Sequence, residues 1–176
     1  MGFLLFLIIG CYSSFNFFLE KPENDNAMEV FVIGKPMKRG SWKEAPNIRI
    51  CATSEIKTFR VQSAIKYWEI LGYKFGSIST DYSPLCMHPR YGEITIALPG
   101  GDMGAQNMAA TKIYTEKLTG NIAKAMISIY PRYGRKDRVL EHELGHALGW
   151  AHYNKKFHIM YPNWQGGGYD HYGLRK

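Results

Sequence analysis

Apolar residues follow two different periods along the central part of the chain. Over residues 61–71 they recur at spacings of three and four, which is typical of an amphipathic helix, and Gly72 is well placed to end it. Over residues 48–51 they alternate with polar residues, which predicts a half-buried strand. Residues 73–79 and 93–98 predict two further strands.

The second half of the domain reads as a hairpin followed by a helix. Residues 111–115 and 124–130 flank the turn-rich stretch 118–121, which predicts two antiparallel neighbours. A helix is expected over residues 138–148, with Asp137 as its N-cap. Strand, helix, strands, hairpin and helix together predict an α+β fold with a mixed sheet and helices packed on it.

The N-terminus has the apolar character of an export signal. Residues 3–9 form an unbroken apolar run, too short to span a bilayer as a helix. The stretch 8–11 resembles the lipobox of bacterial lipoproteins, which makes Cys11 the candidate for lipidation. No Lys or Arg precedes the run, and a buried or disordered apolar terminus is the alternative.

These patterns divide the chain into three parts. Residues 1–19 form the signal peptide or lipoprotein-type segment, and residues 20–46 form a polar linker or extended N-terminal segment with a short strand at 30–33. Residues 47–176 form the folded domain, a length that suits a single core.

Composition changes this picture little. Apolar residues make up 45% and charged residues 21%, as in ordinary soluble domains. The net charge of +7 fits an anionic partner, but the densest basic stretch, residues 132–138, is short. A solvated basic face is the commoner explanation, so no nucleic-acid partner is expected.

Cysteine usage is compatible with export. Without Cys11 the chain retains Cys51 and Cys86, an even pair free to form one disulfide in an oxidising compartment. Two separately buried thiols are the alternative. Neither cysteine has metal-ligand spacing.

The chemistry of the chain is concentrated in the last predicted helix. His142 and His146 are four residues apart, so their imidazoles project from one face and can reach one metal ion. Glu143 is rotated about 100° from His142 and can hold a water beside the metal. Gly149 can provide the sharp turn that brings in His152 as the third nitrogen ligand, which leaves a fourth position open.

Residues 142–152 resemble the long zinc-binding motif of the metzincin peptidases, and residues 158–162 resemble the Met-turn that follows it. Among metzincins, the matrixins, or matrix metalloproteinases, are the most similar. The resemblance implies a zincin-like fold: a mixed, twisted sheet of about five strands with an antiparallel edge strand, two main helices and a Met-turn.

The resemblance also assigns roles to residues. One catalytic Zn²⁺ would be held by His142, His146 and His152, with Glu143 as general base. Met160 would lie beneath the metal without binding it. The edge strand, residues 109–114, would pair with an extended substrate. The wall of an S1′ pocket that favours an apolar P1′ side chain would be formed by Pro162, Asn163 and Trp164.

Several features of the family are missing from the sequence. Cys86 lacks the context of a cysteine-switch propeptide, and no second zinc motif is found. Residues 100–102 are the only stretch that suggests calcium, so Ca²⁺ is left open. His158 is a further candidate metal ligand, because it lies close to His152 in the sequence. The chain therefore resembles a minimal metzincin.

The expected function is a secreted, extracellular or cell-envelope-anchored zinc endopeptidase. Its partners would be protein or peptide substrates, it would touch a membrane only through an N-terminal lipid anchor, and it would act as a monomer. A catalytically silent zinc-binding interaction module and a basic protein that binds an anionic partner are the alternatives.

Overall fold

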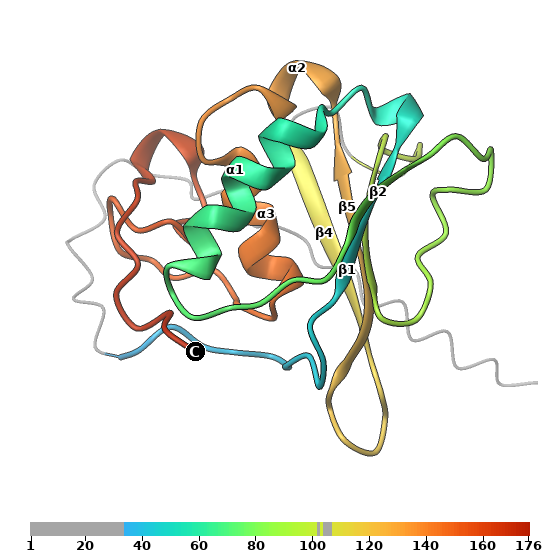
Figure 1. Ribbon diagram of the computed structural model, residues 1–176. Coiled ribbons are helices and arrows are strands. Elements are labelled where there is room, and N and C mark those ends of the chain that lie inside the picture. The colour runs from blue at the N-terminus through green and yellow to red at the C-terminus, as the bar shows by residue number, and fades with distance from the viewer. Residues whose placement is uncertain (1–33, 102, 104–106) are drawn as a thin grey trace, which may run out of the picture. The chain divides into compact units, whose positions relative to one another are not determined.

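The computed structural model describes residues 34–101, 103 and 107–176. This part of the chain contains five strands and three helices, together with two short 3₁₀ turns (Figure 1). The strands are β1 (Asn47–Cys51), β2 (Ile78–Asp81), β3 (Glu93–Ala97), β4 (Ala109–Thr115) and β5 (Ile122–Ile129). The helices are α1 (Thr58–Glu69), α2 (Pro131–Gly134) and α3 (Val139–Ala147), and the 3₁₀ turns are η1 (Ala52–Ser54) and η2 (Trp164–Gly166).

The strands form one mixed sheet in the order β2-β1-β3-β5-β4. β1 is parallel to β2 and β3, and β3 is parallel to β5. β4 lies at the edge and is antiparallel to β5, with Ile113 opposite Ala125. The α+β class, the mixed sheet and the antiparallel hairpin predicted from the sequence are confirmed.

The two longer helices cover one face of the sheet (Figure 1). Alternate strand residues such as Ile48, Ile94 and Ile127 are fully buried and point into the core shared with α1 and α3. The Trp68 indole of α1 donates a hydrogen bond of 2.8 Å to the carbonyl of Glu141 in α3. Arg60 of α1 also pairs with the Glu141 carboxylate. These contacts fix α3, the helix that carries the histidines.

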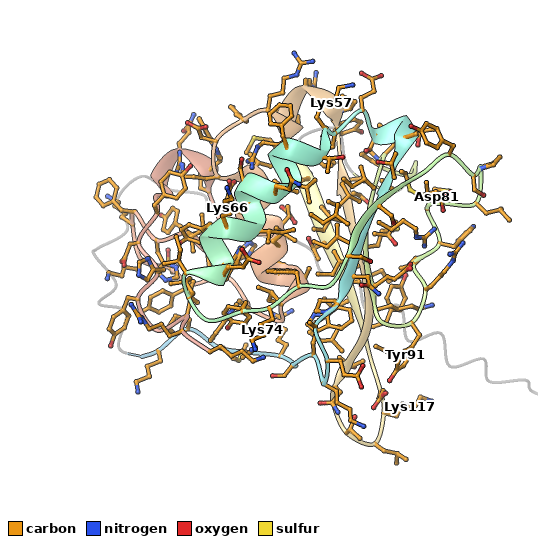
Figure 2. All side chains as sticks on the ribbon, viewed as in Figure 1. Lys57, Lys66, Lys74, Asp81, Tyr91 and Lys117 are labelled. Carbon is orange, nitrogen blue, oxygen red and sulfur yellow. A yellow bond between two sulfur atoms is a disulfide. The ribbon has the colours of Figure 1, made fainter. Side chains whose placement is uncertain are left out.

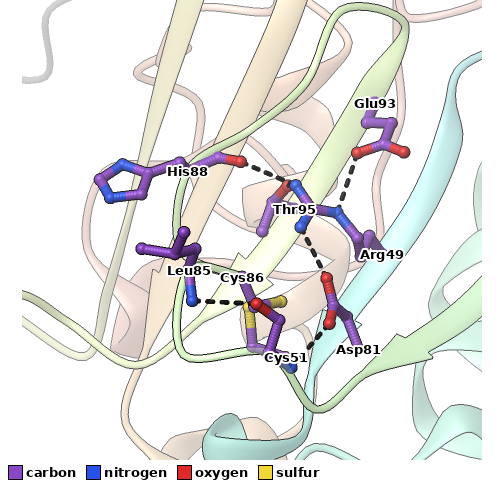
Figure 3. Close-up of polar contacts among 9 residues, drawn as sticks. Arg49, Cys51, Asp81, Leu85, Cys86, His88, Glu93 and Thr95 are labelled. Carbon is purple, nitrogen blue, oxygen red and sulfur yellow. Dashed lines mark hydrogen bonds and ion pairs between the residues drawn. A yellow bond between two sulfur atoms is a disulfide. The ribbon is translucent and has the colours of Figure 1, made fainter.

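The opposite face of the sheet is stabilised by polar contacts and a covalent bond (Figure 3). Arg49 is 4% exposed and pairs with Asp81 and Glu93, each at 2.9 Å. The Cys51–Cys86 disulfide links β1 to the loop between β2 and β3. Of the two alternatives left open for these cysteines, the structure has the disulfide.

Two local predictions are wrong. Residues 73–77 precede β2 instead of belonging to it, because the apolar Tyr73 packs against Trp68 at 5.5 Å between ring centroids instead of joining the sheet. Asp137 does not cap α3: Arg138, with φ of 69°, occupies the N-cap position without a side-chain cap.

Residues 34–46, the described part of the predicted linker or extended N-terminal segment, pack against the domain. For example, Ile122 N–H donates to the Ser41 carbonyl at 2.8 Å. The predicted segment 1–19, Cys11 and the strand at 30–33 lie outside the described residues.

Among the helices that the structure describes, none is both long and apolar enough to cross a bilayer.

Candidate metal centre

Three imidazoles converge beside α3. His142 and His146 lie on the same face of the helix, and their Nε2 atoms are 3.0 Å apart. The Nε2 of His152 lies 3.3 Å from that of His142 and 3.1 Å from that of His146. Nitrogen ligands at 2.0–2.1 Å from a tetrahedral ion are about 3.3–3.4 Å apart, so the spacing fits a single small metal ion.

A helix-ending turn brings His152 to the other two rings. Gly149 N–H donates to the His146 carbonyl at 2.9 Å, and Trp150 N–H donates to the Gly145 carbonyl at 3.0 Å. This is the double hydrogen bond of a Schellman motif, which needs a left-handed residue just past the helix. Gly149 supplies it with φ of 100°, in agreement with the sequence-based expectation. A Cβ at Gly149 would also collide with the backbone of Gly40.

Residues near the start of the described chain form hydrogen bonds with the segment that carries His152 and hold it in place. Arg39 N–H donates to the Gly149 carbonyl at 2.8 Å, and Ala151 N–H donates to the Met37 carbonyl at 3.0 Å. The Trp42 indole donates to the Ala147 carbonyl at 2.8 Å, which satisfies a carbonyl at the end of α3. Residues assigned to the linker therefore support the third histidine.

Backbone carbonyls orient two of the rings for metal binding. The Nδ1 of His142 lies 2.7 Å from the Ile159 carbonyl, and the Nδ1 of His146 lies 2.7 Å from the Trp150 carbonyl. Because a carbonyl only accepts, each Nδ1 carries the proton and each Nε2 presents a lone pair to the centre.

Burial keeps the imidazoles neutral. It lowers the pKa of His142 to about 4, although the hydrogen bond to Ile159 acts in the opposite direction. Burial also lowers the pKa of His146 and His152, to which the positive charge of Arg39 adds. Neutral imidazole is the form that binds metals.

Glu143 follows His142 in α3 and is buried. Burial raises the pKa of its carboxyl to about 7, while the hydrogen bond from Thr111 lowers it. The Thr111 hydroxyl on β4 donates to the Glu143 carboxylate at 2.6 Å. Sequence reasoning missed Thr111, because no local pattern shows which residue of an edge strand lies over the helix.

Met160 is fully buried against α3, and its place beneath a metal ion stays a prediction. Gly145 leaves room for it, since a Cβ at that position would collide with the Met160 sulfur. His158 does not join the three rings: its Nδ1 accepts from Met160 N–H at 3.0 Å and its Nε2 lies 3.1 Å from the Tyr172 carbonyl. Both nitrogens are used to hold the turn in place.

The proposed wall residues follow this turn. The Trp164 indole donates to the Asp137 carbonyl at 2.8 Å, which attaches the segment to the chain just before α3. Asn163 Oδ1 accepts from Gln165 N–H and caps η2, and Pro162 is exposed. Their role in substrate binding stays a prediction.

The donor set indicates a metal centre. In the described part of the chain, His142, His146 and His152 form a cluster of ligand atoms able to hold one ion. Asp102, the acidic residue of the calcium candidate, lies outside the described residues. Comparison with models of known protein families and with curated proteins found no match for this chain.

Proposed function

We propose that the chain is a zinc-dependent endopeptidase related to the metzincins and most like the matrixins. The single observation that carries the proposal is the position of three Nε2 atoms within 3.0–3.3 Å of one another beside the buried Glu143. A closed structural zinc site has four protein ligands, whereas catalytic sites keep one position open.

The nature of the donors supports zinc. Three neutral imidazoles in a tetrahedral arrangement suit Zn²⁺, while Ca²⁺ and Mg²⁺ prefer oxygen ligands. The chemistry that zinc supplies when bound in such a site is Lewis acidity, which polarises a carbonyl and acidifies water.

The other steps of the proposed reaction are assigned to residues of the chain. Glu143 accepts a proton from the attacking water and delivers it to the departing amine. Thr111 holds the carboxylate at 2.6 Å and restricts its rotation. The free edge of β4 offers backbone N–H and C=O groups to an extended peptide, which would place its chain across the site.

The same site could bind zinc without turnover. The location of Glu143 favours catalysis over this alternative, because a buried carboxyl whose pKa is raised to about 7 suits a general base at neutral pH. The Cys51–Cys86 disulfide supports a secreted or envelope-exposed protein.

The test compares casein cleavage by the wild type and by Glu143→Gln, with and without a zinc chelator. Zinc content is measured on the same samples. The proposal expects one zinc per chain in both proteins, loss of at least about a hundredfold in rate for the variant, and loss of activity on chelation.

Glu69→Gln is the matched control, since it makes the same chemical change on the exposed surface of α1. It should retain wild-type activity. A wild type that binds zinc but never cleaves would favour the silent module. Equal cleavage by wild type and Glu143→Gln would reject the enzyme.

A further inference from the structure

Three basic side chains gather on the segment between β5 and α3, close to Trp164, and the proposed function gives them no role. We call Arg132, Lys136 and Arg138 the basic cluster. They follow β5 and lead into α3. From their geometry we propose that the basic cluster selects an acidic residue in the substrate, two or three positions after the cleaved bond. This inference rests on the proposed peptidase function.

The cations of the basic cluster lie over aromatic rings. Lys136 Nζ is 3.8 Å from the centroid of the Trp164 ring, and the Arg138 guanidinium carbon is 5.0 Å from the same centroid. The Arg132 guanidinium carbon is 4.6 Å from the centroid of the Tyr133 ring. A ring face holds a cation in place without neutralising it.

The charges of the basic cluster are not paired with carboxylates in the part of the chain that the structure describes. The ion pairs there use Arg49, Arg60 and Lys155 as their cations. Asp137 stands between two members of the cluster in sequence and is exposed, outside ion-pair distance of them. The net charge of the cluster is therefore positive.

Lys136 retains hydrogen-bonding capacity. Its ammonium group has three donors, and the acceptor found for them is the Met108 sulfur at 3.9 Å. A thioether is a weak acceptor, so a carboxylate would compete with it successfully.

Met108 shows how far the basic cluster lies from the proposed reacting centre. It precedes β4, three residues before Thr111, whose hydroxyl contacts the Glu143 carboxylate. Three residues of extended strand span about 10 Å. A peptide paired with β4 and cleaved beside Glu143 would therefore place its second or third residue from the bond next to Lys136.

The strand direction decides which side of the bond that residue lies on. Antiparallel pairing has the more favourable hydrogen-bond geometry, so we expect the peptide to run antiparallel to β4. The start of β4, next to Met108, then faces the C-terminal part of the peptide. The selected residue follows the cleaved bond.

The experiment uses zinc-loaded full-length protein and synthetic ten-residue peptides with Leu fixed after the expected bond. Glu, Gln or Lys occupies the second or third position after that bond. We expect kcat/KM for the better Glu peptide to exceed that for its Gln counterpart by roughly three- to fivefold at low salt. The ratio should fall in about 0.5 M salt, because the screening length there is only a few ångströms.

Lys136→Met tests the residue that carries the inference, because methionine retains an apolar stem against Trp164 but removes the charge. The Glu-to-Gln ratio should fall towards one. Lys66→Met is the matched control: it removes the same charge from the exposed surface of α1 (Figure 2) and should leave the ratio unchanged.

The outcomes separate the two proposals. A wild-type ratio of one, or a ratio unaffected by Lys136→Met, overturns the inference while the peptidase stands. Absence of any cleavage that depends on Glu143 overturns the proposed function itself, and with it the inference.

Discussion

At the scale of single residues, Gly149 decides whether the third histidine reaches the centre. Its φ of 100° is unfavourable for a residue with a side chain, and an added Cβ would meet the Gly40 backbone. Gly149→Ala should cost about 1–2 kcal/mol through the backbone conformation and about 1–3 kcal/mol more through the collision. Urea unfolding would measure the loss, and zinc titration should show weakened binding.

Gly92→Ala is the control for the backbone contribution. Gly92 has φ of 77° and no atom within 4 Å of an added Cβ. It should lose only the conformational part and bind zinc normally. If both variants are destabilised equally, the contact with Gly40 is not what fixes the turn.

Thr111 is expected to position the Glu143 carboxylate for catalysis. Thr111→Val keeps the shape of the side chain but removes the hydroxyl that lies 2.6 Å from the carboxylate. If the proposed function holds, kcat/KM should fall roughly fivefold with zinc content unchanged. Thr115→Val makes the same change at an exposed site at the other end of β4 and should retain activity. Full activity in Thr111→Val would show that the hydrogen bond does not position the base.

At the scale of elements, the buried Arg49 ties three neighbouring strands together (Figure 3). The pKa of Asp81 on β2 is lowered from 3.8, first by the hydrogen bond from Ser83 N–H and then by that from Arg49. A lowered pKa means that the folded state favours the carboxylate. Its stabilising effect is complete above about pH 4 and is lost as the pH falls through the lowered pKa.

Asp81→Asn tests this pH dependence. The wild type should be more stable than the variant near neutral pH, and the difference should shrink as the pH falls below 4. Urea midpoints between pH 6 and pH 2 would measure it. If the urea midpoints of the two proteins changed in parallel with pH, Asp81 would not be the group that makes strand pairing depend on pH.

The Cys51–Cys86 disulfide anchors the long β2–β3 loop to β1. It joins residues 35 apart in sequence, so removing it frees a sizeable loop in the unfolded chain. The Cys51→Ala/Cys86→Ala double variant should lose about 2–4 kcal/mol of unfolding free energy in urea. Cys86→Ala alone should lose a similar amount, since one substitution already breaks the bond. A midpoint unchanged from the wild type would contradict this expectation.

At the scale of the whole domain, the candidate centre joins parts of the chain that are distant in sequence. α3 supplies two of the candidate ligands and the segment after Gly149 supplies the third, while the carbonyls of Ile159 and Trp150 orient two of the rings. A bound ion should therefore stabilise the native state as a whole.

Zinc removal tests this coupling. At a free zinc concentration about a hundred times the Kd, binding stabilises by about 2.7 kcal/mol, which corresponds to a Tm increase of roughly 5–10 °C for a domain of this size. Calorimetry with zinc and after chelation would measure the shift. His152→Ala should show little dependence on zinc, and a chelated wild type with unchanged Tm would mean that the ion does not bind the folded centre.

The sequence by itself determined the parts of this protein that local spacing encodes. The four-residue separation of His142 and His146 places both rings on one helical face, and Gly149 predicts the turn after it. The hairpin and the helix α1 were predicted because hydrophobic period and turn residues are properties of short segments. The strand at residues 73–77 and the Asp137 cap were wrong: Tyr73 packs against Trp68 instead of joining the sheet, and Arg138 occupies the N-cap position of α3.

Only the tertiary structure decided which distant residues meet. It paired Cys51 with Cys86, placed Thr111 over Glu143, and used Met37 and Arg39 to support the His152 segment. It also turned both nitrogens of His158 to the Met-turn and the Tyr172 carbonyl, away from the other three rings. Such contacts depend on how sheet and helices pack, and neighbours in space leave no periodic trace in the sequence around them.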